Sequence, residues 1–348
     1  MDKMKYVVVM LSIISLAIIV ITLRELKGIF IPLAIAGFLV VSFSPLTKLF
    51  KRKTPKILSL LLSVFILLAI AFLFGTLLFA SFDGFTLEFP RYEAKLTTIL
   101  ESQIIKWDLP ITDVKAYLVN EVDWMGVVNK LSISKVLSNT MGTFVSFSIG
   151  LILTLVFFIF LMLERDEISD RISSALSERR NHNFHRVLKN IEKSIQHYIG
   201  RKTLISLITS GFGMLFISIF HIDFVIISGV LLFFLNYIPN VGSFVASFFP
   251  ILICFLQYGF GWQLFAIATA LTSIQFVMGN LVEPKVMGNA LNLSPITILI
   301  ALIFWSWVWG PVGMILAVPI TSAISLMAKE IRQIRFLYLI MCSNVNKD

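Results

Sequence analysis

The chain has 348 residues, of which 57% are hydrophobic and 14% are charged, and its mean hydropathy is +0.91. Soluble proteins carry charge on roughly a quarter of their residues, so this composition excludes an ordinary soluble domain and indicates an integral membrane protein. The net charge of +9 is accounted for by membrane topology and anionic lipid headgroups, so it gives no support to nucleic-acid binding. The two cysteines, Cys254 and Cys342, imply no disulfide framework.

Apolar runs follow one another along almost the whole chain. They cover residues 6–23, 29–43, 57–82, 144–163, 204–220, 224–238, 241–257, 264–278 and 296–319. Most approach the roughly 20 residues that cross a bilayer as a helix, and the shorter ones fit tilted, paired or re-entrant segments. The predicted fold class is therefore all-α: a polytopic integral membrane protein with about eight transmembrane helices. Broken or re-entrant helices are expected in its C-terminal half, and a small helical insert is expected outside the membrane.

Basic residues give the orientation. The loop 48–56 carries five basic residues and no acidic one, so the positive-inside rule places it, and with it the N-terminus, in the cytoplasm. Residues 81–139 hold eight acids against six bases and are expected outside, whereas residues 164–202 hold nine bases against six acids and are expected inside. The basic C-terminal tail is also expected inside. Two cytoplasmic termini require an even number of crossings, for which eight is favoured and ten is the alternative.

These features divide the chain into six regions. The expected regions are transmembrane helices 1 to 3 (1–80), an external helical insert (81–140), transmembrane helix 4 (141–163), a cytoplasmic amphipathic linker (164–202), a transmembrane transport region with broken helices (203–330) and a cytoplasmic tail (331–348). Apolar residues in the linker recur at helical spacing on one face, which predicts a helix in the cytoplasmic membrane interface. A helix that binds a partner or another subunit is the alternative.

Three polar stretches rich in Gly and Pro interrupt the last apolar runs: NYIPNVGSFVASFFP, GNLVEPKVMGNALNLSP and WGPVGMILAVP. Lipid cannot satisfy backbone N–H and C=O groups, so irregular backbone at membrane depth must be buried in protein or line a water-filled cavity. We therefore expect the function here. The residues expected to break helices are Pro284, Gly288, Pro295, Gly310, Pro311, Gly313 and Pro319. The pattern around Val241 and Gly242 recurs at Val312 and Gly313, which predicts a faint internal duplication.

Neutral polar side chains gather in these stretches and suit a small polar solute, because amides and hydroxyls both donate and accept hydrogen bonds. The residues expected to bind the solute are Asn236, Pro239, Asn240, Gly242, Ser243, Gln275, Asn280 and Asn289. The alternative is structural, with the amides capping broken helices or bonding one helix to another.

Glu283 is the most informative charged residue. A carboxylate at bilayer depth costs about 2.5–3.5 kcal/mol on insertion scales, so it needs a partner or a task. Lys285 is the nearest candidate partner in the sequence. If the two residues lie in a cavity, Glu283 can take up a proton or a sodium ion and couple it to solute movement. If they lie at the cytoplasmic surface, Glu283 is a solvated loop charge.

The three polar regions also resemble a known family. FLNYIPNVGS, GNLVEPKVMGNALNLSP and LIFWSWVWGPVGMILAVP are similar to signature regions of the autoinducer-2 exporter family, also called PerM- or TqsA-like. The resemblance extends over essentially the whole chain and implies a bacterial inner-membrane transporter of about eight spans that assembles as a homo-oligomer, with a pentamer as one option. Some members are linked to export of the quorum-sensing signal autoinducer-2, and others to exchange of sodium or lithium for protons.

The predicted function is a secondary transporter that exports a small polar solute, with autoinducer-2 favoured. A sodium or lithium/proton antiporter with Glu283 as the titrating group is one alternative, and a passive channel or membrane scaffold is another. No metalloprotease, nucleophile-elbow or phosphate-loop motif occurs, so no enzyme activity or cofactor is predicted, and His182 and His185 are not expected to bind a metal. The expected partners are the lipid bilayer, further copies of the chain, the solute and sodium or protons.

Overall fold

The structure is a computed structural model. It describes residues 2–51, 54–73, 75–77, 88, 91–92, 95, 140–175, 178–239, 241–287, 292–330 and 332–343. Helices make up the regular structure of this part of the chain, and the only β pairing there is an isolated bridge between Leu293 and Cys342. Seven of the described helices are long and apolar enough to cross a membrane, and Val225–Leu235 is a shorter apolar helix. The predicted class, an all-α polytopic membrane protein, is confirmed.

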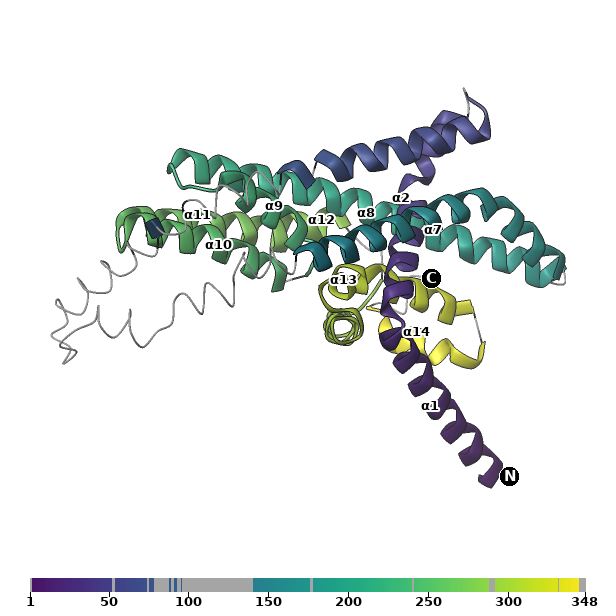
Figure 1. Cartoon of the computed structure of the whole chain (residues 1–348). Coiled ribbons are helices and arrows are strands. Elements are labelled where there is room, and N and C mark those ends of the chain that lie inside the picture. The colour runs from purple at the N-terminus through teal and green to yellow at the C-terminus, as the bar shows by residue number, and fades with distance from the viewer. Residues whose placement is uncertain are drawn as a thin grey trace. The chain divides into compact units, whose positions relative to one another are not determined.

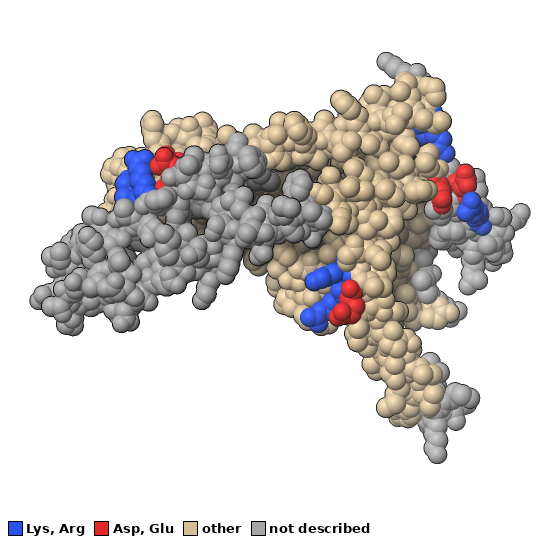
Figure 2. Space-filling model, viewed as in Figure 1, with Lys and Arg blue, Asp and Glu red and all other residues tan. Residues whose placement is uncertain are grey.

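The surface of the described residues suits contact with lipid. On the face shown in Figure 2 most of this surface is uncharged, and the charged side chains gather in small groups. Large apolar side chains such as Phe65, Phe248 and Ile300 are more than half exposed, at 69%, 58% and 62%. Apolar exposure on this scale is rare in soluble monomers and marks a surface that meets a membrane or a protein partner.

The chain folds into two compact units, and unit 1 comprises residues 1–65, 149–200 and 289–348. Its described elements are α1 (Asp2–Glu25), α2 (Lys27–Lys51), the first part of the helix Lys56–Leu77, parts of α7 (Thr140–Ala175) and α8 (Glu178–Ile219), α13 (Pro295–Glu330), the 3-10 helix η3 (Arg332–Ile334) and α14 (Arg335–Met341) (Figure 1). Trp309 of α13 donates its indole N–H to the carbonyl oxygen of Leu23 in α1 at 3.0 Å. This bond joins the two helices within the unit.

α13 changes direction at Gly310. Gly310 has φ 64° and ψ −143°, a conformation that glycine adopts at little steric cost. A Cβ atom at Gly313 would lie 1.9 Å from the carbonyl oxygen of Trp305. Trp305 also donates its indole N–H to Thr321 Oγ1 at 3.2 Å. The segments on either side of Gly310 therefore form a tight helical hairpin that needs glycine at its closest approach.

The prolines expected to break this region behave differently from one another. Pro311 directly follows the kink at Gly310. Pro295 begins α13, where its missing N–H is no loss, and Ser294 Oγ accepts a bond from the Thr297 backbone N–H at 3.2 Å. Pro319 is buried inside the second segment, and the helix continues through it. Of these prolines, only Pro311 lies at an interruption of the helix.

Unit 2 comprises residues 66–148 and 201–288. Besides parts of α7, α8 and the helix Lys56–Leu77, its described elements are α9 (Val225–Leu235), α10 (Val241–Tyr258), α11 (Trp262–Phe276), the π-helix η2 (Val277–Val282) and α12 (Glu283–Met287) (Figure 1). Its core includes Ile217, Leu232, Ala246, Ile267 and Leu271, each at most 1% exposed. These side chains come from α8, α9, α10 and α11 and hold the four helices together.

α9 and α10 form a second tight hairpin. A Cβ atom at Gly242 would lie 1.7 Å from the carbonyl oxygen of Leu235. This contact corresponds to that of Gly313, and the alanines four residues after each glycine, Ala246 and Ala317, are both fully buried. Each copy of the duplicated Val-Gly pattern therefore lies where a helical hairpin closes.

One expected helix break is absent. Gly288 lies outside the described residues, but at Pro284 the helical path continues without interruption from Trp262 to Met287. Proline removes a backbone donor and clashes with the carbonyl four residues before it in an α-helix. In η2 the pairing shifts to the fifth residue and widens the turn just before Pro284. The π-turn thus accommodates the proline, and sequence alone misread this segment as a loop.

The linker expected at 164–202 is not a separate helix. It comprises the end of α7 and the first half of α8, which runs without a break from Glu178 to Ile219. Ile195 and Tyr198 of the predicted apolar stripe are buried within the protein, at 9% and 4% exposure. These two side chains are covered by the chain itself, and the placement of the helix in the membrane interface stays a prediction.

The external insert expected at 81–140 lies largely outside the described residues. Of its described side chains, Tyr92 is buried and its hydroxyl donates to the Asp223 carboxylate. Lys95 donates to the carbonyl oxygen of Gln257 at 2.9 Å, and Gln257 Oε1 accepts from the Asp223 backbone N–H at 3.1 Å. The pKa of the Tyr92 hydroxyl is raised above its usual value, mainly because the group is buried and secondly because it is bonded to Asp223. Within unit 2, this cluster fixes part of the insert to the turn between α8 and α9 and to the end of α10.

Candidate functional site

A buried polar face runs along α8 inside unit 2. Lys202, Ser206, Thr209 and Ser210 are 1%, 0%, 0% and 4% exposed. Their spacing of three and four residues places them on one side of the helix. Polar groups buried in a segment apolar enough to cross a membrane need hydrogen-bond partners or a function.

Lys202 forms an ion pair with Glu283. Lys202 Nζ lies 2.5 Å from Glu283 Oε1, and the two side chains are 2% and 25% exposed. The sequence favoured Lys285 as the partner, but the structure leaves Lys285 exposed and brings in Lys202 from α8. Residues two apart on a helix project from different faces, which explains why Lys285 does not meet Glu283.

The neighbouring residue on α8 binds the other end of α12. Arg201 donates to the carbonyl oxygen of Met287 at 2.9 Å. Carbonyls in the last turn of a helix have no partner within that helix, and a basic side chain satisfies them well. Arg201 and Lys202 together fix both ends of the five-residue helix that carries Glu283.

Asn236 lies one helical turn from the ion pair. Its side chain is buried, and Nδ2 donates to Ser206 Oγ at 3.0 Å. Next to it, the hydroxyls of Thr203 and Tyr237 are hydrogen-bonded at 2.6 Å. Lys202 and Ser206 are four residues apart, or about 6 Å along the helix axis. The turn between α9 and α10 thus brings an amide to the same face of α8 that holds the charges.

The other residues predicted to bind solute are more dispersed. Asn280 is exposed and donates to its own helix at Phe276 O, 3.2 Å away. Gln275 Nε2 is buried and has no hydrogen-bond partner among the described residues. Pro239 and Ser243 are half-buried, and Gly242 closes the hairpin described above. Asn240 and Asn289 lie outside the described residues.

Sequence reasoning missed the residues on α8. Lys202 was assigned to the end of a cytoplasmic linker, and Ser206, Thr209 and Ser210 received no role. A signal was present: a lysine followed by small hydroxyl residues at helical spacing, leading into an apolar run. The stripe was missed because Lys202 had been assigned to the linker, whereas Ser206, Thr209 and Ser210 fell in the transmembrane region that follows it.

The chain is similar to known proteins over most of its length. A family model described as AI-2E family transporter matches residues 10–333. The chain belongs to the AI-2E transporter family. The AI-2 transport protein TqsA of Escherichia coli is 30% identical to it over 330 residues, covering 93% of this chain and 92% of TqsA.

Two further relatives extend the comparison. A Haemophilus influenzae protein, provisionally named a transport protein, is 30% identical over 326 residues, covering 90% of this chain and 91% of its own length. Bacillus subtilis YueF, also provisionally named a transport protein, is 26% identical over 310 residues, covering 86% of this chain and 83% of its own. This AI-2E family member is therefore a multi-pass membrane transport protein, and the predicted family is confirmed.

Proposed function

We propose that this AI-2E family transporter exports a small polar solute through unit 2, with autoinducer-2 as the favoured solute. The observation that carries the proposal is the pair between the buried Lys202 and the partly exposed Glu283. It lies close to the bonded Asn236 and Ser206, and Lys202 and Ser206 belong to a helix apolar enough to cross a membrane. Charged and amide side chains are costly at membrane depth, and they mark solute or ion pathways there.

Autoinducer-2 fits this chemistry. It is a small polyhydroxylated furanone or its hydrate, so its recognition needs several neutral donors and acceptors rather than a fixed charge. Asn236 and Ser206 supply an amide and a hydroxyl at the buried polar face of α8. The name of the E. coli relative TqsA, an AI-2 transport protein, supports this choice of solute.

Exchange of sodium or lithium for protons is the second candidate, and the ion pair itself is the reason to retain it. In this mechanism Glu283 separates from Lys202 when the carboxylate takes up a proton or a cation. The ion pair forms again when the carboxylate gives up that proton or cation. Glu283→Gln separates the two candidates, because glutamine keeps an oxygen that can accept the Lys202 bond but cannot titrate.

The experiment uses purified protein in proteoliposomes with an imposed pH gradient, and sodium and autoinducer-2 are tested separately. For the exporter we expect saturable autoinducer-2 movement that Glu283→Gln leaves mostly intact. Sodium-dependent collapse of the gradient that disappears in Glu283→Gln would instead establish the antiporter. Autoinducer-2 flux that rises linearly with concentration and never saturates would mark a passive channel.

We also propose that both termini are cytoplasmic, that the membrane is the bacterial inner membrane and that the chain assembles as a homo-oligomer. The basic loop 48–56 supports the orientation through the positive-inside rule. Labelling of single cysteines introduced at either end of the chain in inverted and right-side-out vesicles tests it. Mass measurement of the purified complex tests the subunit number.

A further inference from the structure

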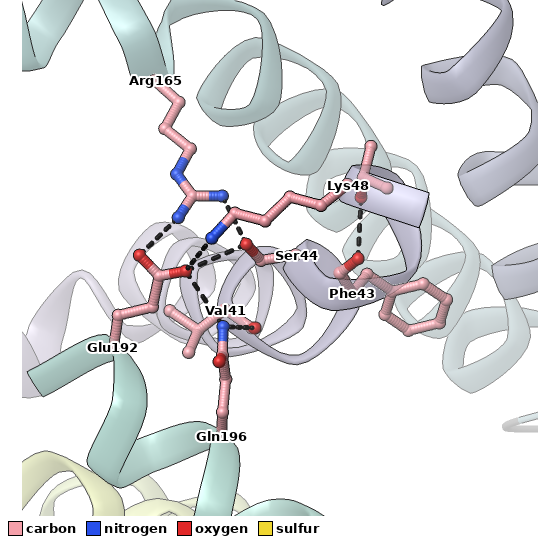
Figure 3. Close-up of polar contacts among 8 residues, drawn as sticks. Val41, Phe43, Ser44, Lys48, Arg165, Glu192 and Gln196 are labelled. Atoms are coloured by element: carbon pink, nitrogen blue, oxygen red, sulfur yellow. Dashed lines mark hydrogen bonds and ion pairs between the residues drawn. The ribbon is translucent and has the colours of Figure 1, made fainter. Parts of the chain in front are cut away.

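In unit 1, α2 contains a proline near its end. Pro45 lies inside the helix, which continues to Lys51. A proline has no backbone N–H, so the carbonyl four residues before it, that of Val41, lacks its usual helical donor. Gln196 of α8 supplies a donor there, because its Nε2 bonds to the Val41 carbonyl oxygen at 3.1 Å (Figure 3). A side chain from another helix thus replaces the backbone bond that is lost at the proline.

Glu192, one turn before Gln196 on α8, contacts α2 on both sides of the proline. Its Oε1 accepts from Ser44 Oγ at 2.9 Å and from Lys48 Nζ at 3.3 Å (Figure 3). Gln196 Nε2 also donates to this oxygen, at 2.9 Å. Ser44 is fully buried, whereas the Lys48 side chain is 66% exposed, and water weakens an exposed ion pair. Glu192 therefore holds the helix more firmly before Pro45 than after it.

α7 strengthens the cluster on the side before the proline. Arg165 Nη2 lies 2.5 Å from Glu192 Oε2, and Arg165 Nη1 donates to Ser44 Oγ at 2.7 Å (Figure 3). One guanidinium thus fixes both the carboxylate of α8 and the hydroxyl of α2 that meets it, and such charge-assisted bonds are among the stronger hydrogen bonds. We expect this part of α2 to stay in place when the end of the helix moves.

A cavity gives the end of α2 room to move. Its volume is about 180 Å³, and its lining includes Thr47, Lys48 and Lys51 of α2 together with Leu60 and Met162. At roughly 30 Å³ for a water molecule in the liquid, this is the volume of several waters. Protein interiors contain few voids larger than one water molecule, so a packed helix end can shift mainly where such a space exists.

We propose that residues 46–51 are a hinged end of α2, which bends at Pro45 into this cavity and is held in place by Gln196 and Glu192. Proline is a common cause of helix kinks, because the turn before it has one backbone bond fewer. A hinge concentrates the change of backbone angles in a few residues while the segments on either side stay rigid. Alternating access requires segments that move, and the hinge is independent of which solute the protein carries.

Hydrogen exchange of residues 46–51 in the full chain in detergent tests the role of Gln196. Gln196→Leu should speed exchange there about 10-fold, because the Val41 carbonyl loses its donor. Pro45→Ala restores a backbone N–H for that carbonyl, so in this background Gln196→Leu should speed exchange less than about 3-fold. Pro32→Ala changes another proline inside α2 and is the matched control, in which the full effect should remain. Equal acceleration in the two proline backgrounds would overturn the proposal.

Distances between pairs of spin labels test the bending itself. Leu49 and Leu188 form the hinge pair, on the end of α2 and on α8, and Ile29 and Leu188 form the control pair, with all three positions exposed. Glu192→Ala should broaden the distance distribution of the hinge pair and leave that of the control pair unchanged. Glu167→Ala removes the same charge from an exposed position of α7 and should change neither. Broadening of both pairs in Glu192→Ala would mean a general loosening of unit 1, and broadening of neither would mean a fixed helix end; either result overturns the proposal.

Discussion

Removing the two partners of the central ion pair should have unequal effects on stability. Lys202 is 2% exposed and Glu283 is 25% exposed, and on the proposed solute path water would reach the carboxylate but not the ammonium group. Glu283→Ala leaves a buried unpaired cation, and we expect it to lower the free energy of unfolding by about 3–5 kcal/mol. Lys202→Met leaves a carboxylate that water can solvate, and we expect a loss of about 1 kcal/mol.

The double variant completes the test. Lys202→Met/Glu283→Ala removes both charges, so it should be more stable than Glu283→Ala alone, with a coupling free energy of about 2–3 kcal/mol. Lys285→Ala is the control, because Lys285 is exposed and does not pair with Glu283 in the structure; we expect a change within about 0.5 kcal/mol.

Unfolding in mixed micelles titrated with sodium dodecyl sulfate gives these free energies, with helix content as the signal. The reasoning is refuted if Glu283→Ala costs no more than Lys202→Met, or if the two losses simply add in the double variant. Either result would mean that Lys202 has another compensating partner or reaches water.

The remaining predictions concern the hairpin, the insert and the amide. Gly242→Ala places a Cβ atom 1.7 Å from a carbonyl oxygen, so we expect a loss of about 1–3 kcal/mol in the same unfolding assay, whereas Gly211→Ala, with open space around it, should cost nothing. Tyr92→Phe removes the bond to the Asp223 carboxylate and should cost about 1.5–3 kcal/mol at pH 7. Because the pKa of Tyr92 is raised in the fold, its contribution is fully present below its unfolded pKa of about 10 and is lost progressively as pH rises from there through the raised folded pKa. The difference in melting temperature between wild type and variant should therefore be constant from pH 7 to pH 9 and begin to narrow at pH 11. Asn236→Leu should abolish solute transport while Asn236→Gln retains part of it, as measured by solute uptake into proteoliposomes.

The sequence predicted the fold class well because hydrophobic runs of bilayer length are a strong signal. It also included Gly310 among the expected helix breaks, and the helix does break there, since a glycine followed by proline in an apolar run has few other uses. It failed at Pro284, because a π-turn absorbs a proline and leaves no trace in composition. The apolar stripe around Ile195 was assigned to the membrane interface because periodicity shows that a face is apolar but not what covers it.

The candidate site was only partly predictable. Glu283 and Asn236 were identified because polar residues stand out in apolar sequence. The partners Lys202 and Ser206 come from another helix, 81 and 30 residues away respectively, and a single sequence does not contain such pairings. Asn280 was included with Asn236 because both lie in polar stretches, but the structure leaves Asn280 exposed and bonded to its own helix.

Uptake of autoinducer-2 into proteoliposomes by the wild-type protein, Asn236→Leu and Asn280→Ala tests the central claim most directly. The proposed path along α8 predicts saturable uptake by the wild type, loss of uptake in Asn236→Leu and near-normal uptake in Asn280→Ala, because only Asn236 lies on the buried polar face. Saturable uptake that survives Asn236→Leu but disappears in Asn280→Ala would contradict the account and place the solute path elsewhere.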